Sequence, residues 1–229
     1  MQQMPQKPAA ERRKSMSDFR IKTCVLGPIS TNCYLVYNNK TKDAVVVDPA
    51  DNAPYILNKC SELGLRPRAV LLTHGHCDHT SAAADVCRSF RIPIYGAAAE
   101  ENLLLSPSMN LSSHMWAEQV SLKEDVKLHD GDELDLLGFS WKVIETPGHT
   151  AGSVCYYLPE EGVLLAGDTL FENSYGRTDM PTGSMSQLVR SIVDKLFPLP
   201  DDTMVYPGHG DATTIGHEKK YNPIAFYNR

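Results

Sequence analysis

The sequence lacks any long apolar run. No stretch approaches the roughly 18 consecutive apolar residues from which a membrane-spanning helix is built. The first twenty residues also contain no apolar segment of the kind that marks a secretory signal. We therefore expect no membrane association and predict a cytoplasmic protein.

Closely paired cysteines are missing as well. None of the cysteines belongs to a Cys-X-X-Cys pair, and they are scattered along the chain at Cys24, Cys33, Cys60, Cys77, Cys87 and Cys155. In a chain of this length without a signal segment, such cysteines are typical of reduced thiols in a cytoplasmic protein. We interpret most of them as small core residues, and we prefer that interpretation for Cys77 over a redox role.

A surplus of basic charge is absent from the body of the chain. The 229 residues carry a formal net charge of −6. Residues 1–17 hold four basic side chains and one acidic side chain, so the remainder carries −9. An acidic chain without a basic stripe repels phosphate backbones, so we expect no nucleic-acid partner.

Strand-like and helix-like segments alternate along the chain. Helical spacing of apolar residues predicts helices over 54–63, 81–90 and 185–196. Strands are predicted at 21–26, 33–37, 44–48, 69–72, 139–145, 153–158, 162–167 and 203–207. This alternation favours an α/β fold built in layers. Because no low-complexity linker divides the chain, we predict a disordered tail over 1–17 and a single domain over 18–229. Residues 97–125 are helical or irregular and are candidates to lie over the site.

The sequence does contain a local excess of histidine. The segment THGHCDH at 73–79 follows an apolar run and holds three of the chain's eight histidines. His74 and His76 are two positions apart, so at an extended strand end they point to the same side. Asp78 and His79 follow where the chain turns into the predicted helix, and they should point elsewhere. One segment can therefore serve two adjacent metal ions.

Three further segments, TPGHT, GDT and PGH, repeat the arrangement of an apolar run followed by a glycine-bearing loop. They contain His149, Asp168 and His209. Functional groups of α/β folds lie on loops beyond the carboxyl ends of strands, and glycine lets those loops bend sharply. We therefore expect these side chains to converge with the first segment.

The combined set supplies ligands for two divalent ions. His74, His76 and His149 would bind the first ion, and Asp78, His79 and His209 the second. Asp168 remains and can bridge the two. Imidazole and carboxylate ligands favour zinc, with iron and manganese as alternatives.

These four segments, in this order, resemble the metal motifs of the metallo-β-lactamase superfamily, whose first metal motif is THxHxDH. The segment VVVDPAD at 45–51 resembles a further motif upstream. The resemblance implies a four-layer αβ/βα sandwich with the metals at one edge of the two sheets. It also implies the same ligand sets as above.

Within that superfamily, TPGHTAGSVCYY and AGDTLFENSYGRTD are most similar to the glyoxalase II branch, the hydroxyacylglutathione hydrolases. The later GRTDMPTGSMSQLVRSI resembles short, single-domain members of that branch. True β-lactamases usually lack a histidine at the His79 position and carry cysteine at the Asp168 position, which argues against antibiotic hydrolysis. By the same resemblance, Arg177 occupies the place of a basic substrate contact, while Asp211 replaces a tyrosine contact.

The resemblance and the metal chemistry together predict a binuclear hydrolase of small-molecule thioesters or esters. A hydroxide that bridges the two ions would attack the carbonyl. Asp78 would orient this nucleophile or carry its proton, and Arg177 would anchor a substrate carboxylate. Asp48 is either a partner of a ligand histidine or a turn former.

Two alternatives with the same fold remain. One is a mononuclear non-heme iron persulfide dioxygenase, which by resemblance would use His74, His149 and Asp168. The other is a lactonase. The sequence leaves open the native metal and the oligomeric state.

Overall fold

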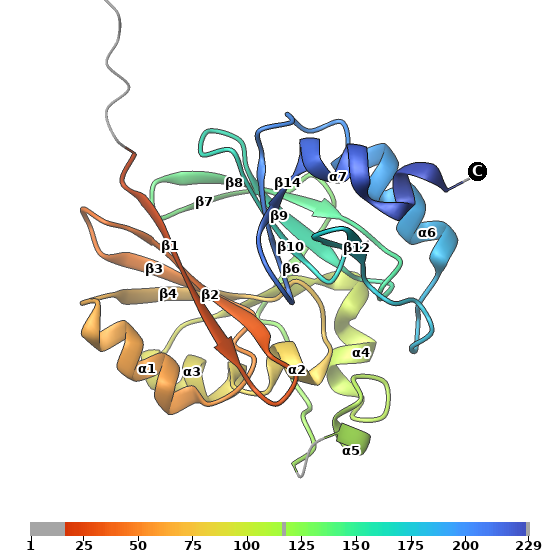
Figure 1. The fold of residues 1–229 in the computed structure, drawn as a ribbon. Coiled ribbons are helices and arrows are strands. Elements are labelled where there is room, and N and C mark those ends of the chain that lie inside the picture. Colours follow the sequence, from red (N-terminus) through yellow and green to blue (C-terminus); the bar gives the residue numbers. More distant parts are fainter. Residues whose placement is uncertain (1–16, 116–117, 228–229) are drawn as a thin grey trace, which may run out of the picture.

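Two six-stranded sheets form the centre of the protein (Figure 1). The computed structural model describes residues 17–115 and 118–227. The first sheet has the order β1-β2-β3-β4-β5-β6 and the second β14-β13-β10-β9-β8-β7. Both sheets mix parallel and antiparallel pairs, as with antiparallel β2–β3 beside parallel β3–β4.

The strands of the first sheet are β1 (Phe19–Leu26), β2 (Thr31–Asn38), β3 (Asp43–Val47), β4 (Arg66–Leu71), β5 (Ile94–Ala97) and β6 (Val126–Leu128). Those of the second are β7 (Glu133–Leu136), β8 (Phe139–Glu145), β9 (Val154–Leu158), β10 (Val163–Gly167), β13 (Met204–Pro207) and β14 (Thr213–Thr214). A separate hairpin pairs β11 (Leu170–Phe171) with β12 (Ser174–Tyr175).

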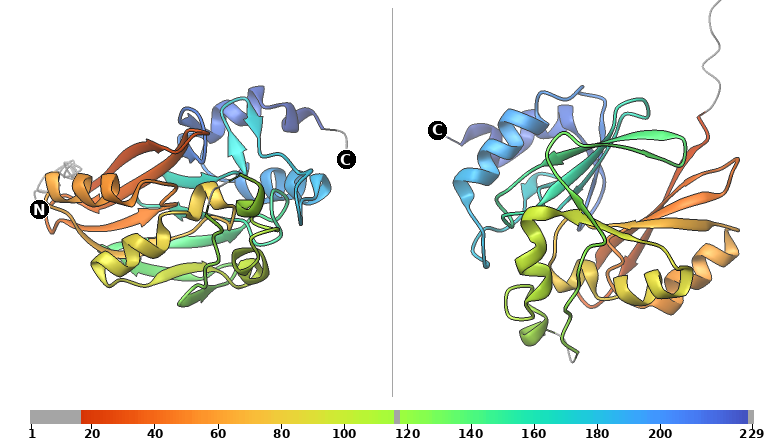
Figure 2. Two further views of the ribbon diagram at one scale, coloured as in Figure 1. Left: turned by 90° about the horizontal axis from the view of Figure 1, so that it is seen from below. Right: turned by 180° about the vertical axis from the view of Figure 1, so that it is seen from behind.

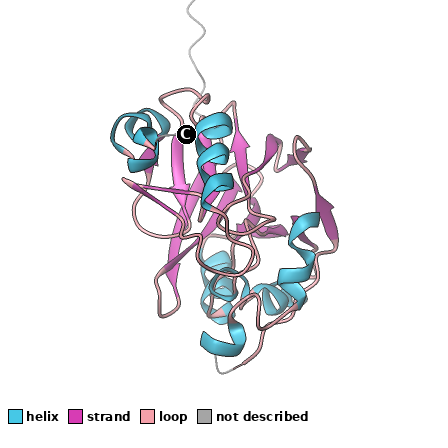
Figure 3. Ribbon diagram, turned by 90° about the vertical axis from the view of Figure 1, so that its right-hand side faces the viewer, coloured by secondary structure: helices cyan, strands magenta, loops and turns pink. Residues whose placement is uncertain are grey.

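Helices cover the outer faces of both sheets. The main ones are α1 (Ala53–Glu62), α3 (Ala83–Phe90), α6 (Met185–Arg190) and α7 (Ile215–Tyr221). The π-helical segment η2 (Ser191–Leu196) continues α6, and η3 (Pro223–Phe226) follows α7. Shorter pieces are α2 (Cys77–Thr80), η1 (Ala98–Glu100), α4 (Glu101–Leu105) and α5 (Ser112–Met115). Figure 2 shows α1 and α3 on the first sheet from two further sides, and Figure 3 shows helices toward both ends of the view with strands between them.

The alternation of side chains along each strand creates the layers. In β10, Val163 and Leu165 face the other sheet, whereas Leu164 and Ala166 face α6 and α7. Such strands are apolar at every position because both of their faces are buried. Three apolar clusters result: one under α1 and α3, one between the sheets, and one under α6, η2 and α7. The predicted four-layer αβ/βα sandwich is thus confirmed.

The eight predicted strands are present, with bounds that shift by up to three residues. The helix predicted from Ser81 is wrong at its start, since Cys77–Thr80 forms α2 and the longer helix begins at Ala83. Asp78 and His79 therefore lie on a helical turn of their own. The strands β5, β6, β7, β11, β12 and β14 were not predicted; each spans two to four residues and lacks a continuous apolar run like that of the longer buried strands.

Within residues 17–115 and 118–227, no helix is both long and apolar enough to cross a membrane. The cytoplasmic location stays a prediction. The predicted tail, residues 1–17, lies outside the described residues except for Ser17, so the domain boundary also stays a prediction.

Candidate metal centre

The predicted metal-binding side chains come from both sheets and meet at one edge. His74 and His76 follow β4 in the first sheet, and α2 then carries Asp78 and His79. His149, Asp168 and His209 follow β8, β10 and β13 in the second sheet. All seven residues predicted from the sequence are brought together.

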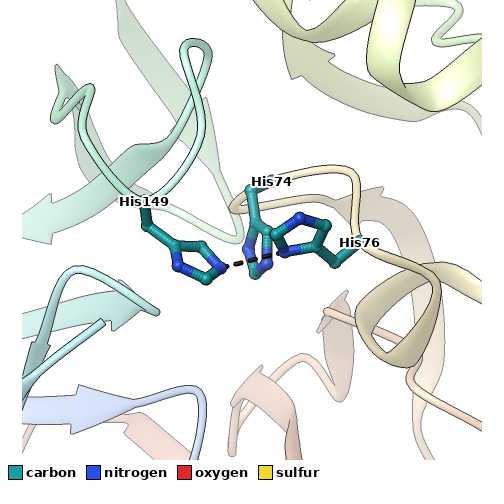
Figure 4. Close-up of side chains that lie close together, drawn as sticks. All are labelled: His74, His76 and His149. Atoms are coloured by element: carbon teal, nitrogen blue, oxygen red, sulfur yellow. Dashed lines mark hydrogen bonds between the residues drawn. The ribbon is translucent and has the colours of Figure 1, made fainter. Parts of the chain in front are cut away.

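Their donor atoms form three overlapping groups, in each of which the atoms lie within 4.8 Å of one another. These groups are His74–His76–His149, His74–His79–Asp168 and Asp78–His79–His209. In Figure 4 the rings of His74, His76 and His149 turn toward one another, with His76 Nδ1 2.9 Å from His149 Nε2. Such spacing allows atoms of one group to share a metal ion.

Two of the histidines have acceptors that fix the position of their ring proton. His79 Nδ1 lies 2.9 Å from a carboxylate oxygen of Asp48, and His149 Nδ1 lies 2.7 Å from the Arg177 carbonyl oxygen. A carboxylate and a carbonyl only accept, so both rings donate from Nδ1. Their Nε2 atoms therefore face the cluster, where a metal ion would be bound.

Thr73 fixes the position of the ring proton of His74 in the same way. The Thr73 hydroxyl lies 2.6 Å from Asp48 Oδ2 and 3.1 Å from His74 Nδ1. The hydroxyl donates its single proton to the carboxylate, so it accepts from the His74 ring. His74 Nε2 is then left with a free lone pair. Asp48 thus supports two predicted ligands, which agrees with its predicted role as a partner of a ligand histidine.

Several buried polar atoms of the cluster have no hydrogen-bond partner. They are Nε2 of His74, His76 and His79, and Oδ1 of Asp168. Leaving one such atom unpaired costs about 1–3 kcal/mol, so several at one place call for a ligand. Imidazole nitrogen and carboxylate oxygen are ligands of divalent transition metals. The residues therefore fit the metal ions that the sequence predicts.

The protonation states suit metal binding. Burial and the neighbouring rings lower the pKa of His74 and His76, that of His76 to about 3. Burial favours protonated carboxyl groups, yet nearby His79 holds the pKa of Asp78 and Asp168 below the ordinary value. Burial likewise disfavours a charged His79, but Asp78 and Asp168 raise its pKa. His74 and His76 are thus neutral imidazoles, whereas the two carboxylates hold a second proton on the His79 ring, which a bound cation would displace.

Two positioning contacts were not predicted from the sequence. Thr31 Oγ1 lies 3.1 Å from Asp78 Oδ2, and Thr31 also pairs with His209 in an isolated antiparallel bridge. Buried Glu100 accepts hydrogen bonds from the backbone N–H of Gly75 at 2.9 Å and of Gly152 at 2.8 Å. It thereby ties the loop of His74 and His76 to the loop of His149. Neither residue lies in a recognisable motif.

Position 208 requires glycine because the backbone there passes close to the side chains of Asp168 and His79. A Cβ atom there would lie 2.0 Å from Asp168 Oδ1 and 2.7 Å from His79 Cε1. The backbone of the His209 loop can therefore pass beside two predicted ligands only without a side chain. This explains the glycine in the PGH segment.

A cavity of about 440 Å³ opens over the cluster. His76, Asp78, His149, Asp168 and His209 form its floor. Its remaining described lining residues are Ser174, Arg177 and five apolar side chains, which we call the apolar rim: Ile29, Leu111, Phe171, Tyr175 and Met180. A larger hollow of about 580 Å³ beside α1 and α3 contains none of the predicted ligands. The cavity over the cluster is the candidate substrate site.

Arg177 lies at this cavity, but its guanidinium group is engaged. Its Nε and Nη2 each lie 2.7 Å from one of the two Asp179 carboxylate oxygens. Leu111 places the segment between α4 and α5 at the cavity, whereas residues 118–122 line the hollow beside α1 and α3, so a position of the whole region 97–125 over the site stays a prediction. Cys77 is fully buried, and burial raises the pKa of its thiol to about 12, as expected of a core residue.

The comparison with protein families identifies the fold family. Residues 26–209 match the family model described as the metallo-β-lactamase superfamily. The chain belongs to the metallo-β-lactamase superfamily. It is a metal-binding protein of a hydrolase family, and its histidine–aspartate cluster implies divalent metal ions.

Similar superfamily members come from curated proteins and solved structures. The hydroxyacylglutathione hydrolase GloC of Haemophilus influenzae is 35% identical over 195 residues, covering 84% of this chain and 92% of GloC. The crystal structure of BLEG-1 B3 metallo-β-lactamase is 41% identical with a TM-score of 0.85, covering 89% of this chain and 98% of that one. TTHA1623 in a di-iron-bound form is 34% identical with a TM-score of 0.79, covering 88% and 98%.

Proposed function

We propose that the protein is a binuclear metal-dependent hydrolase of small-molecule thioesters. The observation that carries the proposal is the convergence of seven imidazole and carboxylate side chains, five of which form the floor of one cavity, with unpaired ligand atoms among them. Similarity to the hydroxyacylglutathione hydrolase GloC supports the thioester as substrate class.

We assign His74, His76 and His149 to one ion and Asp78, His79 and His209 to the other. Asp168 is assigned as the bridge, which its two oxygens support. Its Oδ1 lies 3.4 Å from His79 Nε2, whereas its Oδ2 lies 3.6 Å from His149 Nε2. One carboxylate thus contacts a histidine of each proposed site. We favour zinc, and the di-iron relative makes iron the first alternative.

When bound, divalent ions would polarise a carbonyl and lower the pKa of a bound water, so that this water could attack at neutral pH. The side chains of the cavity would position the water and accept its proton. Asp78 faces the cavity and holds its carboxylate against Thr31 and His209, so it can orient the attacking water and accept its proton. The apolar rim limits the access of bulk water to the reacting carbonyl.

Metal content per chain, combined with thioester hydrolysis, tests this proposal. We expect close to two ions per chain in protein purified without added metal, and a loss of one ion together with activity in His79→Ala. His129→Ala is the matched control, because His129 is exposed and lies outside the three donor groups. One ion per chain that His79→Ala retains would contradict the two-site assignment.

The same experiment separates the alternatives. A single iron per chain, with oxygen consumed in the presence of a persulfide, would identify the dioxygenase that shares this fold. Hydrolysis of lactones in preference to thioesters would identify the lactonase. Each result would replace the proposed thioester hydrolase.

Hydrolysis of β-lactams is a second candidate function. The specific observation in its favour is the 41% identity to BLEG-1, which is named a B3 metallo-β-lactamase. The sequence prediction against antibiotic hydrolysis therefore requires a direct test. A chromogenic cephalosporin and an acyl thioester, assayed with the same preparation, decide between the two by their kcat/KM values.

A further inference from the structure

We infer that the site is selective for thioesters with uncharged acyl and thiol portions, and that Asp179 sets this preference by neutralising Arg177. The inference rests on the proposed thioester hydrolysis and concerns the same cavity. Uncharged thioesters are the preferred substrates within the thioester class, and Asp179 is the residue that determines this specificity.

The first observation is the apolar rim. Its side chains come from separate segments: the β1–β2 turn, the chain before α5, the strands β11 and β12, and the loop after Arg177. Ile29 is 44% exposed, unusual for isoleucine, yet it lines the cavity. Phe171 packs edge-on against His209 with 6.2 Å between ring centroids, which continues the apolar wall down to the floor. Most of a bound substrate would therefore contact the carbon atoms of the apolar rim.

The second observation is that the guanidinium group of Arg177, which lines the cavity, is already paired. Among the described lining residues, Arg177 is the one lysine or arginine. Asp179 binds its guanidinium through both carboxylate oxygens at 2.7 Å. The two residues are only two positions apart, so little chain ordering opposes the pairing. The paired Arg177 offers little net positive charge to a substrate carboxylate.

An anionic thioester therefore meets two obstacles. Each of its carboxylates would have to displace Asp179 or lie against the apolar rim, where the hydroxyl groups of Ser174 and Tyr175 can donate hydrogen bonds but supply no positive charge, which is unfavourable. The acidic body of the chain, with a formal charge of −9 outside residues 1–17, adds long-range repulsion. An uncharged thioester meets neither obstacle and gains contact with the rim.

Two thioesters with the same acyl group test the inference on the metal-loaded enzyme. S-butyryl-N-acetylcysteamine is uncharged, whereas S-butyrylglutathione carries two carboxylates and an ammonium group. We expect the wild-type kcat/KM to be about tenfold higher for the uncharged ester, an effect in the range of one or two contacts. In Asp179→Asn the freed Arg177 should narrow that ratio about two- to fivefold, as expected of an exposed charge pair.

Two further variants sharpen the test. Asp201→Asn is the matched control, because Asp201 also pairs with a basic side chain, Lys219, but lies outside the cavity lining; its ratio should equal that of the wild type. In the double variant Arg177→Gln/Asp179→Asn, kcat/KM for the glutathione ester should not rise as it does in Asp179→Asn, because the guanidinium group is absent. A salt titration should weaken the effect of Asp179→Asn, because the contact is electrostatic and exposed.

Each outcome decides the matter. A wild-type preference for S-butyrylglutathione would overturn the inferred substrate class. An unchanged ratio in Asp179→Asn would overturn the role of Asp179. If the enzyme holds two ions and hydrolyses neither ester, the proposed thioester function fails, and this inference fails with it. The last result is distinct from the first two, in which hydrolysis is retained.

Discussion

Asp48 and His79 lie 31 positions apart in the sequence and are joined by a 2.9 Å hydrogen bond between Oδ2 and Nδ1. Asp48 has a left-handed backbone, with φ at +48°, and its other carboxylate oxygen accepts from the backbone N–H of Thr73 at 2.8 Å. The turn after β3 therefore aims a carboxylate at the ring that supports the second proposed ion. Orientation of His79 depends on this contact.

Asp48→Asn should weaken metal binding by about 10- to 100-fold, as for other groups that hold a ligand histidine in place. Asparagine tolerates the left-handed backbone, so the fold is preserved. Competition with a chromophoric chelator measures the affinity. Asp43→Asn, on the exposed end of β3, serves as the control and should bind metal like the wild type. Equal affinities of the two variants would contradict the role of Asp48.

Thr31→Val should lower kcat about 10- to 100-fold with little change in KM. The substitution preserves shape and removes the hydroxyl that contacts Asp78 Oδ2, which costs about one hydrogen bond to a charged group. Thr31→Ser keeps the hydroxyl and should retain most of the activity. Steady-state kinetics on one thioester separates the two parameters, and a serine variant as weak as the valine variant would refute the contact's importance.

Glu100→Gln should reduce both stability and metal content. The amide can accept from Gly75 or from Gly152, but it turns an N–H group toward the other. We expect a loss of about 1–3 kcal/mol in the free energy of unfolding, because one buried donor is left unpaired. Thermal unfolding and elemental analysis measure the two effects. Glu101→Gln is the control, because Glu101 is half-buried and pairs with Lys127 at the surface; it should change neither quantity by a comparable amount.

Gly208→Ala should abolish hydrolysis and release metal, because the added methyl group would overlap Asp168 and His79. A fall of at least about 100-fold in kcat/KM is expected from displacement of ligands on this scale. Gly96→Ala is the control, since its Cβ would meet neighbouring atoms at ordinary contact distances of 3.5 Å or more. Circular dichroism checks that both variants fold.

Removal of both metal ions by a chelator should lower the melting temperature by about 15–30 °C. Ions that bind the folded chain at 1,000 times their dissociation constant contribute about 4 kcal/mol each, and each kcal/mol shifts the melting temperature of a domain this size by about 2–4 °C. Differential scanning calorimetry with and without chelator measures the shift. An unchanged transition would argue that the cluster holds no ion.

The sequence indicates the layered fold and the metal residues for physical reasons. Strands buried on both faces, such as β9 and β10, are continuous apolar runs that can be recognised without a structure. The histidines are marked by their rarity and by the glycines beside them. Short strands at or beside a sheet edge, such as β6 and β7, carry charged residues that conceal their pairing.

The contacts of Thr31 and Glu100 are not visible in the sequence. Thr31 lies 47 positions from Asp78, and Glu100 lies 25 positions from Gly75 and 52 from Gly152. Only the packing of the two sheets brings these pairs together. The pairing of Arg177 with Asp179 is local, yet an ion pair between such neighbours is not determined by their spacing alone.

Each proposed ion site draws on both sheets: His74 and His76 with His149, and Asp78 and His79 with His209. Neither half of the chain alone holds a complete set of ligands for either ion. On this assignment a complete set of ligands exists only after the second half of the chain has been synthesised and the two sheets have docked. The bound ions would then join the two sheets and oppose their separation.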